Sequence, residues 1–333
     1  MKKRGFTEVQ FTWIFILIAG AVFLLIFAKI TGKQRDISEE KVSAITLRGL
    51  SSVFTSLSIS SNAFHEGELP KQSIKVSCDK FTIAGQSMPF GNSIIFSPAL
   101  IKGEKYLSMT LQWNVPFKVT NFVYLTHPEV RYIFVENGLD IVYTNVLSKI
   151  PDKMKYPEGI IEVGNTEVDK DKNNYKVRFI YFGENSNPTT NPNNIILPNT
   201  KDYDITKLEV LSDKINFYRK NKNNWDDIGG SSYLDDEMLL GAIFSEDKET
   251  YECVVGRAFE LLRKEAGFNE KVVTKLRDAI VDPCKTIYNE ALVQFTIILQ
   301  NLAISSSSFL KSAMSELDKL NADAEKNSCI TLY

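Results

Sequence analysis

VQFTWIFILIAGAVFLLIFA, residues 9–28, is a run of twenty residues without a charged side chain. As a helix that rises about 1.5 Å per residue, the run is about 30 Å long, which is the thickness of the hydrocarbon core of a bilayer. Such a run is rare in soluble folds, where it would have to be a buried core helix. The stretch therefore predicts one transmembrane anchor, which we place at residues 9–30.

The charges around this run predict its orientation. Lys2, Lys3 and Arg4 precede it in the short tail 1–8, whereas the positive residues after it are interleaved with acids. Because positively charged flanks stay inside, we expect a cytoplasmic tail and an extracytoplasmic remainder, at the cell membrane. A removable secretory signal is the alternative. Its apolar core is usually about 7–15 residues, shorter than this run.

The residues before the run resemble a second kind of signal. Lys2-Lys3-Arg4-Gly5-Phe6 is similar to the class III signal of type IV pilin-like proteins, which implies cleavage after Gly5 and an apolar helix kept as a filament core. The departure is the acidic residue. Bacterial pilins carry Glu at the fifth mature position, whereas here Glu8 would be third and Gln10 fifth. Processing between Gly5 and Phe6 stays open as an alternative.

The chain after the anchor has the composition of a folded protein, with 44% hydrophobic and 24% charged residues and a net charge of -2. Its Lys and Arg residues are scattered, whereas nucleic-acid binding needs a basic stripe, so we expect no nucleic-acid partner. The chain has only two histidines, His65 and His127. With only two histidines, a histidine-based zinc site or a catalytic triad is therefore nearly excluded.

Hydrophobic spacing divides this part into three regions. Residues 31–61 predict an amphipathic stalk helix, which packs on the following domain or makes a coiled-coil or filament contact. Its apolar stripe is Val42, Ile45, Leu50, Val53 and Leu57. Residues 62–244 predict a strand-rich extracytoplasmic domain, and residues 245–333 a helical C-terminal region. The predicted fold class is α+β: an N-terminal transmembrane helix, a strand-rich mixed α/β middle and a helical C-terminal third.

Shorter patterns fill in these regions. In the middle, 138–149 predicts a helix, 131–182 a β-α-β unit, 221–232 a polar loop and Met238–Phe244 a last buried strand. In the C-terminal region, 249–264 and 269–280 predict two helices. Pro283 then opens a third helix, because proline is tolerated in the first turn.

All four cysteines, Cys78, Cys253, Cys284 and Cys329, follow the anchor. None has a metal-ligand spacing, and an even count outside the cytoplasm predicts two disulfides, with four buried free thiols as the alternative. Three pairings are possible. Cys253 and Cys284 each begin a predicted helix and can meet in a helical hairpin, which would leave Cys78 to pair with Cys329.

The acidic residues lack the arrangement of a site. Asp235-Asp236-Glu237 predicts a solvated loop end, because neighbouring residues of a strand point to opposite faces and do not converge. Asp202 and Asp204 lack the ligand spacing of a calcium loop. We therefore predict no catalytic, cofactor-binding or metal-binding residue, and no cofactor.

The other reactive or aromatic residues are also assigned to structure. We predict that His127, before a proline, lies in a turn, and that His65 lies in a polar linker. The serines at 60–61 and 305–308 lack the G-x-S-x-G setting of a nucleophile. The aromatic residues of 113–124 alternate, which favours a core strand over a binding surface.

Three stretches carry a resemblance. They are VQFTWIFILIAGAVFLLIF, SCDKF with NVPFKVTNFVYLTHPEVRYIFV, and NSCITLY. Together they resemble uncharacterised single-pass membrane proteins of small-genome archaea. The resemblance covers most of the chain through short motifs. It implies an archaeal cell envelope and an inside N-terminus, and it supplies no activity.

These observations predict a membrane-anchored extracytoplasmic envelope protein with a binding or structural role. Its partners would be the lipid bilayer and an unknown protein or a second copy of itself. A pilin-like filament subunit is the first alternative. A membrane-tethered enzyme that uses carboxylates of the middle region is the second.

Overall fold

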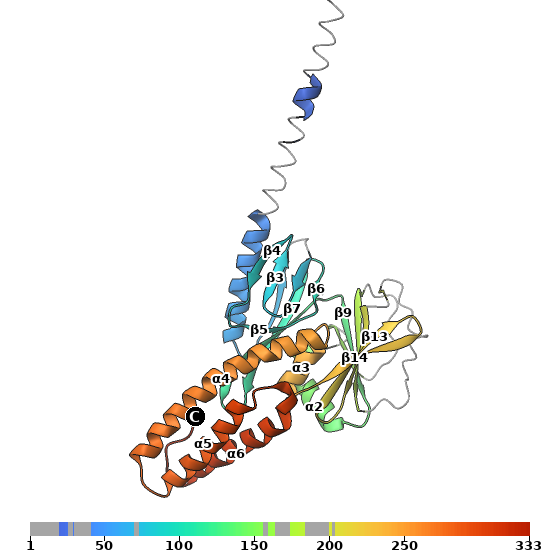
Figure 1. Ribbon diagram of the computed structural model, residues 1–333. Coiled ribbons are helices and arrows are strands. Elements are labelled where there is room, and N and C mark those ends of the chain that lie inside the picture. Colours follow the sequence, from blue (N-terminus) through green and yellow to red (C-terminus); the bar gives the residue numbers. More distant parts are fainter. Residues whose placement is uncertain are drawn as a thin grey trace, which may run out of the picture.

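The structure is a computed structural model that describes most of the chain after the predicted anchor. The described residues are 20–25, 29, 41–69, 73–155, 159–163, 174–183, 200–201 and 204–333. Figure 1 shows a helix at one end of the molecule, β-sheets beside it and a layer of helices at the other end. Within the predicted anchor, residues 20–25 and Lys29 are described, and they are helical and exposed. The rest of the anchor, with Gly5 and Phe6, lies outside the described residues.

The helix Lys41–Ile59, here called the stalk helix, lies in the predicted stalk region. Among the described residues it is the one helix that could cross a membrane by length and composition, a weak criterion that core helices of soluble proteins also meet. One face of this helix is buried in the protein. It consists of Ser43, Leu47, Leu50, Phe54 and Leu57. The predicted stripe is therefore right for Leu50 and Leu57. It is wrong for Val42 and Ile45, which lie on the other side of the helix and are 49% and 70% exposed.

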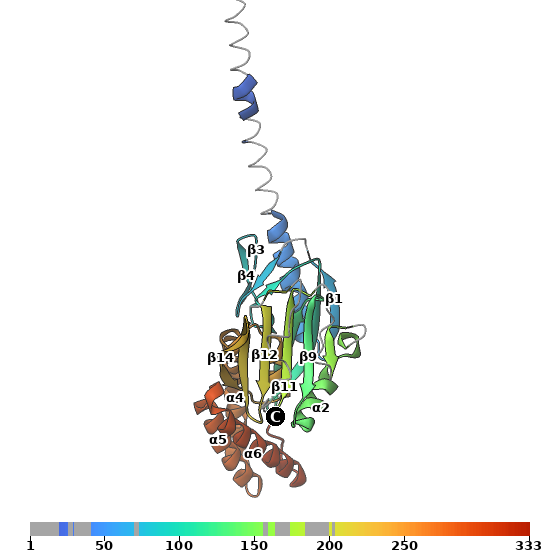
Figure 2. The same cartoon turned by 90° about the vertical axis from the view of Figure 1, so that its right-hand side faces the viewer.

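Three sheets make up the middle of the chain. The central sheet has the strand order β1 (Phe64–Glu68), β7 (Lys105–Asn114), β8 (Lys118–Thr126) and β5 (Ile94–Phe96). The small sheet has the order β4 (Gln86–Pro89), β3 (Lys80–Ile83), β2 (Ile74–Val76) and β6 (Leu100–Ile101). The large sheet, which faces the viewer in Figure 2, has the order β10 (Ile161–Val163), β9 (Val130–Glu136), β11 (Lys176–Phe182), β12 (Ile205–Val210), β13 (Lys214–Asn221) and β14 (Asn224–Ser232).

The central sheet is apolar on both faces. On β8, Phe122 and Tyr124 face the main core, whereas Val123 and Leu125 face a second core, because strand side chains alternate. The stalk helix and the small sheet supply most of the second core. The main core includes residues of the central sheet, the large sheet and the helices between them. The stalk helix is thus part of the folded domain.

The predicted β-α-β unit is confirmed. Strands β9 and β11 pair in parallel, and the helix α2 (Asp140–Lys149) follows β9 in the chain. All seven residues of β11 are buried, which is typical of a parallel strand covered on both faces. The described residues therefore form a mixed α/β fold, as predicted for the middle of the chain.

Two predicted elements of the middle region are wrong. Met238–Phe244 lies in the helix α3 (Asp236–Phe244) and is not a strand. Its residues are buried on every side, and an uninterrupted apolar run cannot distinguish a short helix from a strand. The predicted loop 221–232 contains the strand β14. This strand lies at the edge of the large sheet and only its Ser231 is buried, so it carries no apolar alternation.

The C-terminal third is helical, as predicted. The two helices expected at 249–264 and 269–280 are one helix, α4 (Lys248–Ala279), whose buried residues continue through Ala266 and Val273. Pro283 is the N-cap of α5 (Cys284–Gln300), which confirms the third helix. The short helix η4 (Ile304–Ser306) separates α5 from the last helix, α6 (Ser307–Lys326).

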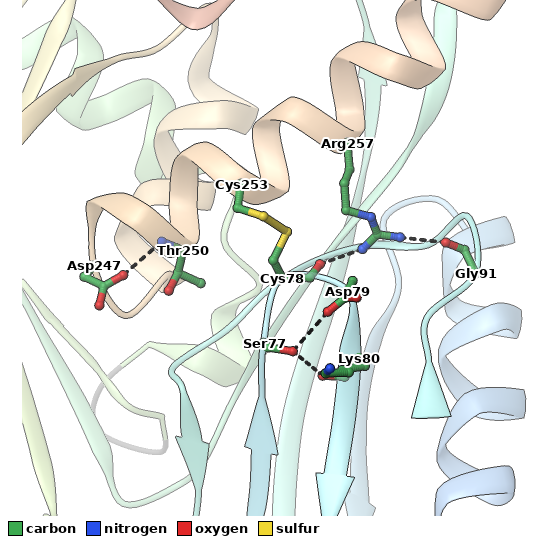
Figure 3. The surroundings of a disulfide bond; sticks show 9 residues. All are labelled: Ser77, Cys78, Asp79, Lys80, Gly91, Asp247, Thr250, Cys253 and Arg257. Atoms are coloured by element: carbon green, nitrogen blue, oxygen red, sulfur yellow. Dashed lines mark hydrogen bonds between the residues drawn. A yellow bond between two sulfur atoms is a disulfide. The ribbon is translucent and has the colours of Figure 1, made fainter. Parts of the chain in front are cut away.

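The structure has two disulfides, as predicted, but the pairing of Cys253 with Cys284 that we considered is wrong. Cys78 pairs with Cys253, and Cys284 pairs with Cys329. Because α4 is unbroken, it carries the chain about 40 Å away from Cys253 before Cys284 is reached, so these two cannot meet. The first bridge ties the small sheet to α4 (Figure 3). Beside it, the Arg257 guanidinium donates to the carbonyl oxygens of Cys78 and Gly91, each at 2.6 Å.

Candidate functional site

Asp235 is a carboxyl group with a strongly raised pKa, two residues before Glu237, which lines a surface cavity. It is the N-cap of α3, where its Oδ1 accepts from the Met238 backbone N–H at 2.8 Å. Its Oδ2 accepts from Trp113 Nε1 on β7 at 2.7 Å. Burial, with a smaller contribution from the nearby Glu237, raises the pKa of Asp235 to about 7. The prediction of a solvated loop end is therefore wrong for Asp235.

The next two acids point to a lysine of α2. Lys149 Nζ lies 2.5 Å from Glu237 Oε1 and 3.7 Å from Asp236 Oδ2. Burial also raises the pKa of Asp236. Asp236 and Glu237 reach the same lysine from the first turn of a helix, whereas neighbouring residues of a strand would alternate. An acid-rich first turn also complements the positive end of the helix dipole.

A surface cavity of about 570 Å³ opens beside this cluster. Its lining is polar for the most part: Asn62, Met109, Thr110, Leu111, Gln112, Ser148, Lys149, Ile150, Pro151, Asp152, Lys155 and Glu237. The charged side chains that line the cavity form ion pairs with one another: Lys149 with Glu237, and Lys155 with Asp152. Such a cavity can hold a small polar molecule through hydrogen bonds.

The cavity lacks the geometry of a nucleophilic site. Its Ser148 hydroxyl donates to the Asn145 carbonyl oxygen at 2.7 Å, and no histidine or cysteine is among the described residues that line the cavity. Asp235 is held by two donors and does not line it. The arrangement therefore supports binding better than acyl transfer or hydrolysis, which require a nucleophile within reach of a base.

The two histidines have structural surroundings. His127 lies in the turn between β8 and β9, as predicted, and its Nδ1 accepts from the Glu129 backbone N–H at 3.0 Å. Burial lowers the pKa of His127 to about 4, so the ring is neutral at pH 7. His65 is part of strand β1, so the prediction of a polar linker is wrong. It stacks on Tyr106 of β7.

A buried ionic network lies at the N-terminal end of β11 in the large sheet. The sequence did not predict it. Lys176 on β11 pairs with Glu246, and its Nζ lies 3.9 Å from Asp204. Arg178, two residues along β11, donates to the carbonyl oxygens of Ala242 and Ile243 at the end of α3. These contacts bind α3 to the sheet. Asp202 lies outside the described residues.

The remaining predicted site residues fall into the core or into bridges. Trp113, Phe122 and Tyr124 are fully buried, which confirms a core assignment for the aromatic stretch. All four cysteines are in disulfides. Within the described part of the chain, no group of three His, Cys, Asp or Glu side chains is placed to hold a metal ion.

Comparisons of this chain with protein-family models, with curated proteins and with solved structures gave no match. The resemblance to single-pass archaeal membrane proteins, and the resemblance to a pilin-like signal, both stay predictions.

Proposed function

We propose that this protein is tethered to a membrane by its N-terminal apolar run and has a binding or structural role outside the cytoplasm. The observation that carries the proposal is the use of all four cysteines in two disulfides, one across 175 residues and one across 45. Stable disulfides are rare in a reducing cytosol and common in secreted and envelope proteins. The twenty uncharged residues at 9–28 supply the tether.

The shape of the molecule is compatible with a tether. The stalk helix lies at one end of the domain, and α5 and α6 lie at the other end (Figures 1 and 2). The described residues 20–25 lie beyond the outer end of the stalk helix, away from the sheets. In this arrangement the large sheet and the C-terminal helices would project from the membrane.

Thiol trapping in intact cells tests the compartment. The cells are quenched with acid, and the full-length chain is alkylated before and after reduction. We expect no alkylated cysteine before reduction and four afterwards. Four alkylated cysteines before reduction would place the chain in a reducing compartment and refute the proposal.

Extraction of the same membranes tests the tether. We expect the chain to stay in the pellet after an alkaline carbonate wash and to be released only by detergent. Added protease should reach the domain from outside the cell, because the domain lies beyond the cytoplasmic tail in this topology. Release by carbonate alone would show that residues 9–28 do not span the bilayer.

A pilin-like filament subunit is the second candidate. It is supported by the signal-like residues at Gly5 and Phe6 and by exposed apolar residues on the stalk helix. The intact mass of the native protein separates the two candidates. A chain that has lost residues 1–5 supports the filament, and a chain that retains them supports the permanent tether.

The described carboxylates do not lead us to propose an enzyme. Asp235 accepts two hydrogen bonds from Trp113 and Met238, and its neighbours Asp236 and Glu237 face Lys149. This arrangement gives the carboxylates a capping and ion-pairing role.

A further inference from the structure

The stalk helix has a second regular face, opposite the buried one. Its residues are spaced alternately by three and four, and all are exposed: Val42, Ile45, Gly49, Ser52, Ser56 and Ile59, here called the outer stripe. The apolar members Val42, Ile45 and Ile59 are 49%, 70% and 75% exposed. A three-four spacing is the heptad pattern by which two helices pack along their length.

The middle of the outer stripe allows a second helix to approach closely. A Cβ atom added to Gly49 would meet nothing within 4 Å. Small residues at such positions let helix backbones come close, with larger apolar residues packing on either side. The Ser56 hydroxyl already donates to the Ser52 carbonyl oxygen at 3.0 Å, so burial would not leave its proton unpaired.

The chain that precedes the helix indicates what would cover this face. Forty residues precede Lys41, and they include the uncharged run 9–28 that we propose as the anchor. Two copies anchored in one bilayer would hold their stalk helices parallel and at the same height. The same stripe of each copy can then meet the other about a two-fold axis along the helices.

The charges flanking the stripe are compatible with this pairing. Lys41 and Arg48 lie on one side of the stripe, at positions that face Thr46 and Val53 of the other helix in a parallel pair. The two-fold axis places the positive residues of the two copies on opposite sides of the contact. The buried face points away from the outer stripe, so the two domains would lie on the outside.

We propose that the outer stripe pairs with the outer stripe of a second copy of this chain, in a parallel two-helix contact above the membrane. This inference rests on the proposed membrane tether. The six residues that each helix contributes would bury far less surface area than the roughly 800 Å² per partner of a standard interface. The contact therefore depends on the high local concentration that a shared membrane provides.

Two neighbouring serines provide a matched test in the full-length chain. Ser52 belongs to the outer stripe, whereas Ser51 is one residue, or about 100°, around the helix and only half-exposed. All four native cysteines are in bridges, so Ser52→Cys or Ser51→Cys adds the one free thiol. The membranes are oxidised and the protein is separated without reductant.

We expect Ser52→Cys to give a band of twice the chain mass, with at least about ten times the yield of Ser51→Cys, because a disulfide needs Cβ atoms about 4 Å apart. A second substitution, Ile45→Lys, should lower the Ser52→Cys yield by about fivefold or more, because it places a charge in each half of the contact. Thr55→Lys, which is exposed but lies beside the stripe, is its control and should leave the yield unchanged.

Equal yields from Ser52→Cys and Ser51→Cys would overturn the inference. A cross-linked band of any other mass would also overturn it, because the stripe would then face a different protein. Failure of the tether is recognised separately. A chain that carbonate releases refutes the anchor, whereas a chain that is retained but not cross-linked refutes only the pairing.

Discussion

Removal of the Cys78–Cys253 bridge should destabilise the protein more than removal of the Cys284–Cys329 bridge. The two variants to compare are the double replacements by serine, one for each bridge. The first bridge joins residues 175 apart and the second joins residues 45 apart. In the chain-entropy description, the stabilisation grows with the logarithm of the loop length, which gives about 5 kcal/mol for the first bridge and about 4 kcal/mol for the second.

Most native contacts near the longer bridge should survive its removal. Arg257 donates to the backbone carbonyl oxygens of Cys78 and Gly91, and a serine at position 78 keeps its carbonyl oxygen. The loss of stability should therefore arise mainly from the unfolded chain, which becomes free to expand. A more expanded unfolded state exposes more surface, so the dependence of the free energy of unfolding on urea concentration should become steeper.

Urea unfolding of the full-length chain in detergent, without reductant, measures both quantities. The fluorescence of Trp113, which is fully buried in the fold, can report the transition. We expect the Cys78–Cys253 variant to unfold at the lower urea concentration and with the steeper slope. The reasoning is refuted if the Cys284–Cys329 variant is the less stable of the two, or if neither slope changes.

Three further predictions follow from the structure. A non-reducing peptide map should link Cys253 to the Cys78 peptide and Cys284 to the Cys329 peptide; a Cys253–Cys284 fragment would contradict the fold of α4. Asp235→Ala should lower the free energy of unfolding by about 2–4 kcal/mol, since it removes an N-cap and leaves the Trp113 N–H unpaired; a loss below about 1 kcal/mol would argue against the buried geometry. Asp235 has a folded-state pKa of about 7 against 3.8 for the free group, so its protonated form contributes stability that is complete below about pH 4 and is lost as the pH rises to about 7. Stability measured across that range should fall more steeply for the native chain than for Asp235→Asn, and parallel curves would refute the shift.

Part of the fold could be predicted from sequence because some segments carry a local signal of their own type. In α2 the apolar residues recur at helical spacing, and the structure has a helix there. The strands β9 and β11 are short β-branched and aromatic runs bounded by turn residues, and both were recognised. The main errors come from segments that lack such a local signal. The apolar residues of helix α3 are buried all round, and only Ser231 of β14 is buried, so neither element shows a period.

The candidate site was harder to predict, because it depends on contacts between distant segments. Trp113 and Asp235 are 122 residues apart in the chain, yet they share a hydrogen bond. One local signal was available. An Asp-Asp-Glu sequence directly before an apolar run is typical of a helix N-terminus, and that interpretation would have identified both α3 and its N-cap. The pairing of the cysteines likewise depends on whether α4 breaks near Gly267, and the structure shows that it does not.

The burial of one face of the stalk helix against the central sheet has a mechanical consequence. Because Leu47, Leu50, Phe54 and Leu57 hold the helix along its length, the domain cannot swivel about a loose joint at residue 60. If the chain is tethered as we propose, any rotation of the helix about its own axis would turn the whole domain with it. The orientation of the stalk helix then determines the direction in which the large sheet and the terminal helices face.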